Sequence, residues 1–299
     1  MDALLPGPLV GDAWLAEHLG DQRLVILDAT TELPSPRHDG DYRVASGRDA
    51  WHDAHIPGSR HADLTGDLSD HTAPHHFTVP APEDLAAALT RLGVHDGTSV
   101  VVYDNGGGIW AARLWWMLRS ISVPAAVLDG GWGGWLAAGH PTKSGPAAEV
   151  PAALPGLLTP VPLPGFWADI THADAVARGE RAGALVCALP AAGFDGTAPT
   201  RYARRGHIPG SLSLPGRDLL DDAGRFLPRT ELAARVSAVL QAQVSPVVLY
   251  CGGGISAAAV ALALTLLGRE DVTLYDGSLE EWAASERPLL VTATARPPR

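Results

Sequence analysis

The stretch Val100–Arg119, VVVYDNGGGIWAARLWWMLR, occurs again as Pro246–Thr265, PVVLYCGGGISAAAVALALT. In both copies a short apolar run reaches three consecutive glycines, and a helix-forming pattern follows. This order predicts a buried strand, a tight turn and a helix, because glycine adopts the positive φ angles that tight turns need. The repeat therefore predicts that one supersecondary unit is present twice in the chain.

Two further blocks repeat in the same order. HIPGSRHADL from His55 matches HIPGSLSLPG from His207, and VLDGGWGGWLAAGHP from Val127 matches LYDGSLEEWAASERP from Leu274. Two folded copies suit a chain of 299 residues better than a solenoid of short repeats. Because both copies contain the HIPG histidine, we expect these two histidines to fix turns rather than to act in catalysis.

Proline and glycine are dense between the two copies, over residues 139–165. Both residue types interrupt helices and strands, so this stretch predicts an extended linker. We therefore expect an N-terminal domain over residues 1–144, a Pro/Gly-rich linker over residues 145–165 and a C-terminal domain over residues 166–299.

Within each copy, short β-branched runs alternate with longer helical patterns. The runs begin at residues 24, 99, 125, 184, 246 and 272, and the helical patterns include 81–93, 109–121, 230–242 and 255–267. Runs that are apolar at every position indicate strands covered on both faces, and their alternation with helices is typical of a parallel sheet. The sequence therefore predicts an α/β fold with functional residues at the carboxyl ends of strands.

The composition limits the partners and the compartment. A net charge of −11 and a pI of about 5.5 disfavour binding to nucleic acid, and no apolar run approaches the ~20 residues of a membrane span. The first residues lack a secretion-signal pattern, so we expect a cytoplasmic protein whose two cysteines are free thiols. Cys187 falls in a predicted strand, where an inert packed thiol is favoured over a resolving cysteine.

We expect no cofactor and no metal. His71, His75 and His76 resemble a metal-binding cluster in their spacing, but they lack partner cysteines or carboxylates at fixed positions. Neither glycine loop has the Gly-Lys-Ser/Thr of a nucleotide-binding P-loop or the glycine spacing of a dinucleotide site. A cysteine phosphatase is disfavoured because Ala257 stands where an arginine would clamp phosphate.

Cys251 is either a nucleophile or a buried thiol beside a tight turn. It lies at a predicted strand-to-helix junction, where backbone N–H groups and the positive end of a helix stabilise a thiolate. The residues expected to cradle its sulfur are Gly252, Gly253, Gly254, Ile255 and Ser256, the last by capping the helix or by donating to the sulfur. Asp104 holds the matching position in the first copy, so only the second copy has a nucleophile.

The chain resembles the two-domain rhodanese-like sulfurtransferases of the thiosulfate and 3-mercaptopyruvate sulfurtransferase group. The resemblance rests on the duplicated HIPGS and glycine-loop motifs, on VLDGGWGGW and YDGSLEEW, and on DLSDHTAP from Asp67, and it covers nearly the whole chain. It implies tandem rhodanese-like α/β domains, each a mostly parallel sheet flanked by helices, with a catalytically silent N-terminal copy.

The resemblance also implies a persulfide relay at the interface of the two domains. Cys251 would take a sulfane sulfur from thiosulfate or 3-mercaptopyruvate and pass it to cyanide or to a thiol, with a protein thiol as a further candidate acceptor. The alternative is a non-enzymatic sulfur-binding or interaction module that has lost donor recognition. Gly252 and Gly253 favour this alternative, because the family carries basic residues or a serine there.

The donor-binding residues depart from the family pattern. Gly193 stands where the family has the arginine of an Arg-Phe/Tyr pair. The remaining candidates for an anion site are Arg201, Arg204 and Arg205, with solvated loop charges as the alternative. His76 is a further substrate-binding candidate, because it neighbours the position of the family's histidine.

Overall fold

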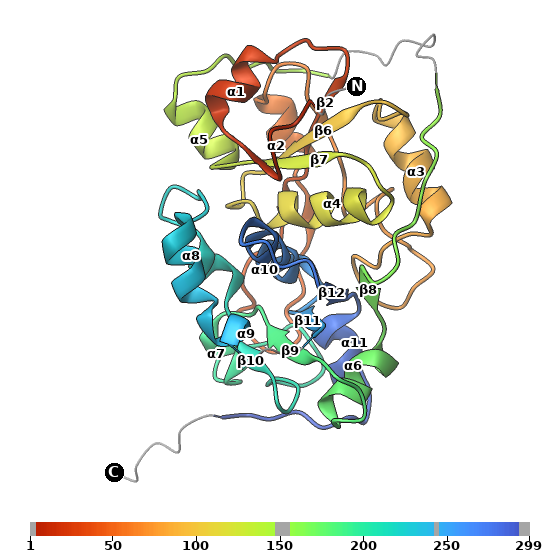
Figure 1. Ribbon diagram of the computed structural model, residues 1–299, viewed down its shortest axis with the longest axis vertical. Helices are drawn as coiled ribbons and strands as arrows, with labels where there is room; N and C mark the ends of the chain where they lie inside the picture. The colour runs from red at the N-terminus through yellow and green to blue at the C-terminus, as the bar shows by residue number, and fades with distance from the viewer. Residues whose placement is uncertain (1–3, 147–155, 242–244, 293–299) are drawn as a thin grey trace.

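The computed structural model describes residues 4–146, 156–241 and 245–292 of the chain. Its main sheets are two five-stranded parallel sheets, one from each half of the sequence (Figure 1). The first has the order β1-β7-β6-β2-β5, with strands at Leu9–Val10, Ala125–Leu128, Ser99–Tyr103, Leu24–Asp28 and Arg60–His61. Each neighbouring pair in this sheet is parallel.

The second sheet repeats this order strand for strand. It runs β8-β12-β11-β9-β10, with strands at Trp167–Ala168, Val272–Tyr275, Val247–Tyr250, Ala184–Cys187 and Leu212–Ser213, all paired in parallel. A separate antiparallel pair, β3 (Thr31–Glu32) and β4 (Ala45–Ser46), belongs to the first half. The predicted α/β fold with two copies of a parallel sheet is therefore confirmed.

Helices cover both faces of the sheets, as the uniformly apolar strands predicted. In β6, Val100 and Val102 belong to the core shared with α4, whereas Val101 and Tyr103 pack on the opposite face with residues of α1 and α5. The helices of the first half are α1 (Asp12–Glu17), α2 (Arg48–Asp53), α3 (Pro82–Arg91), α4 (Ile109–Ser120) and α5 (Gly131–Ala137).

The second half contains α6 (Ile170–Ala177), α7 (Ala191–Phe194), α8 (Arg229–Arg235), α9 (Ser237–Gln241), α10 (Ile255–Leu266), α11 (Ser278–Ala284) and the 3-10 turn Gly216–Leu219. The expectation of one helix over residues 230–242 is wrong for the described residues, and Ala242 lies outside them. The chain leaves helical geometry at Val236, which is fully buried, and Ser237, a weak helix former, begins the second helix.

The two helices that follow the glycine loops, α4 and α10, pack against each other between the sheets (Figure 1). All residues of α4 except Arg119 are buried, and one apolar core cluster extends through both halves of the chain. A helix that is apolar on all sides has to be covered on all sides, which explains why neither helix shows a polar face in the sequence. This packing places the ends of the two glycine loops near the junction of the halves.

The predicted linker of residues 145–165 is described in part, since residues 147–155 lie outside the described residues. Residues 156–165 pass along the first half toward β8 (Figure 1). Thr159 bonds through its N–H and its hydroxyl to the Asp96 carboxylate at 2.9 and 2.8 Å, and the N–H of Leu163 donates to Ser120 O at 2.8 Å. The end of the linker is therefore fixed to the first half, whereas the domain boundaries stay a prediction.

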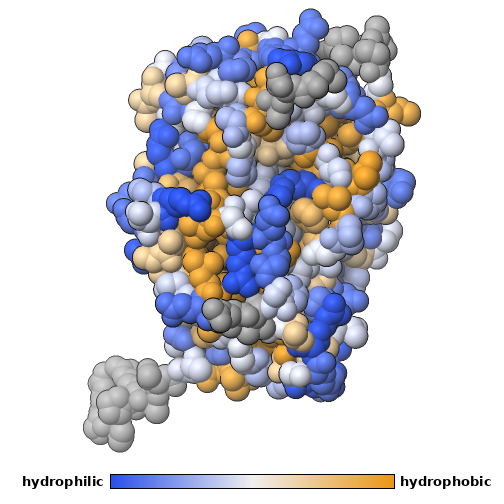
Figure 2. All heavy atoms as spheres, viewed as in Figure 1, coloured by the Kyte–Doolittle hydropathy of each residue, from blue (hydrophilic) through white to orange (hydrophobic). Residues whose placement is uncertain are grey.

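Polar and apolar residues are mixed over the face that Figure 2 shows. The large apolar side chains that are exposed among the described residues are Leu136, Leu157, Val161, Leu163, Leu290 and Val291. Within residues 4–146, 156–241 and 245–292, no helix combines the length and the apolar character that crossing a bilayer requires.

Candidate active site

Cys251 follows the carboxyl end of β11 directly, and α10 begins four residues later at Ile255 (Figure 1). Gly254 is the N-cap of α10 with φ 77°, a left-handed conformation that favours glycine. The expectation that Ser256 caps this helix is wrong, because the N-cap position belongs to Gly254 and no side chain bonds there. Cys251 is 2% exposed, so the residues around it cover it almost completely.

The start of α11 fixes the main chain of the Cys251 loop. The N–H of Cys251 donates to Ser278 Oγ at 3.2 Å, and this hydroxyl donates to Tyr275 O at 2.8 Å. The N–H groups of Leu279 and Glu280 donate to the carbonyls of Cys251 and Gly252 at 3.1 and 2.9 Å. Ser278 has φ 49°, unusual for a residue other than glycine, and such strain is often found beside functional groups.

The matching loop of the first half holds a carboxylate in place of the thiol. Asp104 follows β6, and its oxygens accept the N–H groups of Gly106, Gly108 and Ala111 at 2.6, 2.8 and 2.8 Å. Burial raises the pKa of Asp104, although these hydrogen bonds act in the opposite direction. The turn between strand and helix is therefore a cradle of N–H groups in which an anion can be held.

The two loops differ in length by one residue. Residues 104–108 separate β6 from α4, whereas residues 251–254 separate β11 from α10. The interval from Asp104 to Cys251 equals that from Asp129 to Asp276, so the strands of the two copies keep one spacing, whereas α4 and α10 are shifted by one position. The loop that holds the thiol is the shorter one.

Tyr202 covers the Cys251 loop from outside. A Cβ placed on Gly252 would lie 1.7 Å from the Tyr202 hydroxyl oxygen, so this phenol occupies the space that a side chain at position 252 would need. Burial raises the pKa of Tyr202, and the neighbouring Cys251 acts in the same direction. Tyr202 therefore presents a protonated hydroxyl beside the loop.

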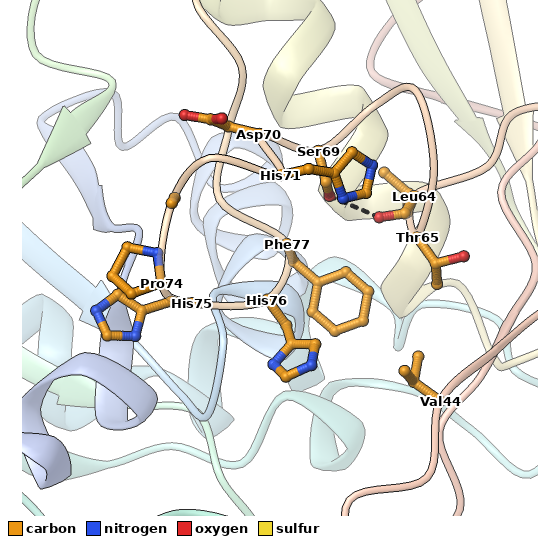
Figure 3. Close-up of a pocket in the computed structure, with 11 residues that line it drawn as sticks. Val44, Leu64, Thr65, Ser69, Asp70, His71, Pro74, His75, His76 and Phe77 are labelled. Carbon is orange, nitrogen blue, oxygen red and sulfur yellow. Dashed lines mark hydrogen bonds between the residues drawn. The ribbon is translucent and has the colours of Figure 1, made fainter.

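A loop of the first half supplies the other wall of the site. Figure 3 shows the side chains of His76 and Phe77 pointing together toward Val44, with His75 pointing elsewhere. Phe77 has φ 60°, and its ring packs on Trp110 at a centroid distance of 5.3 Å. One ring carbon of Phe77 is 3.7 Å from the place of a Cβ on Gly253, so both halves of the chain contribute to the site.

His76 joins the first half to the second at this wall. Its Nδ1 lies 2.5 Å from Glu280 Oε1, and its ring stacks on Tyr42 at 4.0 Å. Burial is the main cause that raises the pKa of Tyr42, followed by the charge of Glu280. The structure therefore brings the predicted substrate-binding candidate His76 close to the Cys251 loop.

Arg201 also lies at this junction. Its Nη2 donates to Pro34 O at 2.6 Å, and its guanidinium carbon is 5.8 Å from the centre of the Tyr42 ring. Its Nε is buried and has no hydrogen-bond partner among the described residues. Since Arg201 adjoins Tyr202, it is the predicted arginine that the structure places beside the Cys251 loop.

Arg204 and Arg205 have other surroundings. Arg204 donates to the carbonyls of Trp282, Ala283, Ser285 and Arg287 around the end of α11. Arg205 forms an ion pair with Asp39 of the first half, with Nε–Oδ1 at 3.0 Å and Nη2–Oδ2 at 2.9 Å. None of these partners belongs to the Cys251 loop, so the contacts favour structural roles for both arginines.

An ion pair inside the molecule also ties the two halves together. Nη2 of Arg113 on α4 donates to Asp276 Oδ1 at 2.6 Å and to Phe77 O at 2.7 Å. A Cβ on Gly254 would lie 2.8 Å from Nη1 of the same guanidinium. The Arg113 side chain is fully buried, so this pair sets the position of the Phe77 loop against the Cys251 loop.

Cys187, His71 and His75, unlike His76, take no part in this arrangement. Cys187 is fully buried in β9, and burial raises the pKa of its thiol to about 12. His71 and His75 line a cavity of about 200 Å³ beside the Phe77 loop (Figure 3). In the described part of the chain, no three His, Cys, Asp or Glu side chains are arranged to hold a metal ion.

The HIPG histidines have matching surroundings. Nδ1 of His55 is 2.8 Å from Trp51 O and its ring stacks on Trp51, whereas Nδ1 of His207 is 2.8 Å from Phe194 O and its ring stacks on Phe194. Both histidines are buried. These equivalent contacts agree with a turn-fixing role in each copy.

Comparisons of the sequence and of the structure with known proteins point to the same family. A model of the rhodanese-like domain matches residues 12–138 and 188–285. The 3-mercaptopyruvate sulfurtransferase of Escherichia coli (strain K12) is 36% identical over 278 residues, covering 92% of this chain and 94% of that protein. The thiosulfate sulfurtransferase of Gallus gallus is 30% identical over 281 residues, covering 92% of both. A crystal structure of an Escherichia coli 3-mercaptopyruvate sulfotransferase, 34% identical, matches with a TM-score of 0.76 over 91% of this chain and 98% of that one.

Proposed function

The chain belongs to the family of rhodanese-like sulfurtransferases, and we propose that Cys251 is the residue on which it carries sulfur. In the first step, the Cys251 thiolate attacks the outer sulfur of a donor. An S–S bond forms, and the bond between that sulfur and the rest of the donor breaks. The bonding electron pair leaves with sulfite if thiosulfate is the donor, or as the enolate of pyruvate if the donor is 3-mercaptopyruvate.

In the second step, a nucleophilic acceptor attacks the outer sulfur of the Cys251 persulfide. The acceptor is cyanide or a thiol, and a thiol on another protein is included. The S–S bond breaks, the electron pair returns to Cys251, and the thiolate is regenerated. Neither step needs a metal or an organic cofactor, because in both a nucleophile attacks a divalent sulfur atom and the electron pair of the broken bond leaves with the displaced group.

The observation that carries this proposal is the cradle around Asp104. Three backbone N–H groups hold a carboxylate in the first copy of the turn, and Cys251 occupies the same place after the strand in the second copy. A persulfide anion needs the same kind of N–H donors to be stabilised. Gly252, Gly253, Gly254, Ile255 and Ser256 are the residues that we propose to supply them.

The remaining site candidates are assigned by their positions. We propose that Arg201 and His76 face the donor, since both contact Tyr42, which lies close enough to Cys251 to feel its charge. Arg204 and Arg205 are proposed to act only through the shape of the loop that carries Arg201, given their contacts with α11 and Asp39. We propose the cytoplasm as the compartment, because a thiolate carrier needs surroundings that keep its cysteine reduced.

Intact-mass spectrometry after treatment with either donor tests the proposal. We expect one adduct of about 32 Da on Cys251 and none on Cys187, because the reaction needs a thiolate and burial in β9 raises the pKa of the Cys187 thiol to about 12. The Cys251→Ala variant should fold normally and transfer no sulfur. An adduct on Cys187 alone, or retained transfer in Cys251→Ala, would falsify the proposal. The alternative of a sulfur-binding module predicts an adduct without turnover, and the relatives, which are named as enzymes, give it no support.

A further inference from the structure

Glu280 places one of its carboxylate oxygens against the Cys251 loop. Its Oε1 is bonded to His76 Nδ1, whereas Oε2 is buried and has no hydrogen-bond partner among the described residues. Oε2 lies 3.7 Å from the position of a Cβ on Gly253. The N–H of Glu280 donates to Gly252 O at 2.9 Å, so the backbone fixes this residue to the loop.

Apart from His76, which contacts Oε1, the charged groups around the loop have partners other than this carboxylate. Arg113 is paired with Asp276 at 2.6 Å, and Arg201 extends toward Pro34 and the Tyr42 ring. The Glu280 side chain is 14% exposed, so solvent screens its charge only in part. A donor that brings its sulfur to Cys251 therefore approaches a negative charge on one side of the loop, and with it an acceptor oxygen that has no partner among the described residues.

Thiosulfate and 3-mercaptopyruvate respond differently to such an oxygen. Thiosulfate carries two negative charges next to its outer sulfur and has no hydrogen to donate, so it is repelled. The thiol of 3-mercaptopyruvate is a weak hydrogen-bond donor, and the single charge of that molecule lies on a carboxylate at its other end. One residue can thus attract one donor and repel the other, which is how specificity is commonly achieved.

Building on the proposed role of Cys251, we propose that Glu280 is a specificity-determining residue that selects monoanionic thiol donors such as 3-mercaptopyruvate and disfavours thiosulfate. The glycines at positions 252 and 253 leave the donor-facing side of the loop without side chains. Glu280, held by His76, supplies the missing recognition from α11. The group that chooses the donor therefore lies outside the loop that carries the sulfur.

Steady-state kinetics of the full chain with each donor test this proposal. The wild type should have a higher kcat/KM for 3-mercaptopyruvate than for thiosulfate. Glu280→Gln should shift the ratio of the two toward thiosulfate by about tenfold, as expected for removal of one like-charge contact. Glu280→Asp keeps the charge and should retain most of the preference. Glu231→Gln, which removes a charge from the exposed first turn of α8, should leave the ratio unchanged.

Three results would overturn the proposal. One is a wild type that uses thiosulfate at least as well as 3-mercaptopyruvate, which requires no variant. The others are an unchanged ratio in a folded Glu280→Gln protein and an equal shift in Glu231→Gln. The adduct experiment distinguishes failure of this proposal from failure of the proposed function. No adduct on Cys251 with either donor contradicts the sulfur-carrier role of Cys251. An adduct on Cys251, together with an unchanged ratio of kcat/KM for the two donors in Glu280→Gln, contradicts only the role of Glu280.

Discussion

The Asp104 carboxylate and the Cys251 thiol stand at the same point of two copies of one turn, each directly after the last residue of a central strand. In the first copy the carboxylate fills the cradle of N–H groups, with three hydrogen bonds at 2.6 to 2.8 Å. The first copy thus carries its acidic group as part of its own chain. The second copy has a thiol there, to which an anionic sulfur can be added and from which it can be removed.

The pH dependence of stability should reveal the state of Asp104. Burial raises the pKa of its carboxyl above the value in the unfolded chain. The stability that Asp104 contributes is therefore fully present below the unfolded pKa and is lost as the pH rises through the folded pKa. From about pH 4 to about pH 7, the unfolding free energy of the wild type should fall relative to Asp104→Asn, by about 1.4 kcal/mol per unit of raised pKa.

Urea unfolding at both pH values measures this difference. Asp222→Asn is a suitable control, because it removes an aspartate from an exposed position. The difference in unfolding free energy between Asp222→Asn and the wild type should stay constant over the same pH range. If the Asp104→Asn difference also stays constant, or changes in the opposite direction, the folded-state pKa of Asp104 is not raised.

The Arg113–Asp276 pair should matter far more for stability than a surface pair. Arg113→Met leaves the Asp276 carboxylate largely buried without its cation, and breaking a buried pair on one side costs about 3 to 5 kcal/mol. The double variant Arg113→Met/Asp276→Asn should recover part of this loss, because it leaves no unpaired charge. The midpoint of urea unfolding, followed by tryptophan fluorescence, gives the comparison.

The exposed pair of Arg91 and Asp67, 3.0 Å apart, is the matched control. Arg91→Met should cost about 1 kcal/mol or less, as is usual for pairs that solvent screens. A loss as small as this in Arg113→Met would show that the buried pair does not hold the two halves together.

The strands of the two main sheets, the glycine loops and the position of Cys251 after a strand could be predicted from the sequence. Apolar runs and glycine triplets act over short stretches of chain, and the repeat let each copy be read against the other. Asp104 and Cys251 could be matched from the sequence alone for this reason. The one-residue difference between the two loops is hidden in the sequence, because an additional residue between α10 and β12 makes the interval from Cys251 to Asp276 equal to that from Asp104 to Asp129.

Tyr42, Tyr202 and Glu280 could not be predicted as part of the site. Tyr42 and Tyr202 lie outside the three repeated blocks, whereas Glu280 lies in the block from Leu274, where the first copy has Gly133 at the matching place. The three residues meet only through the packing of the two halves. The only indication in the sequence that Tyr202 belongs to the site was its position next to the candidate Arg201. The charge of Arg204 and Arg205 gave no means to distinguish binding to an external anion from binding to carbonyls or to Asp39.

Alanine should destabilise the protein at Gly252 and be tolerated at the adjacent Gly253. In Gly252→Ala, the new Cβ would lie 1.7 Å from the Tyr202 hydroxyl oxygen and 2.5 Å from Cζ, so the phenol must move, at about 1 to 3 kcal/mol. In Gly253→Ala, the nearest atom is 3.7 Å away, and stability should change by about 0.5 kcal/mol or less. The midpoint temperature of thermal unfolding and the yield of the Cys251 adduct should both fall in Gly252→Ala, and neither should fall in Gly253→Ala. Adding Tyr202→Ala to Gly252→Ala should restore stability relative to the sum of the single changes. Equal effects at the two glycines would show that Tyr202 does not occupy this space.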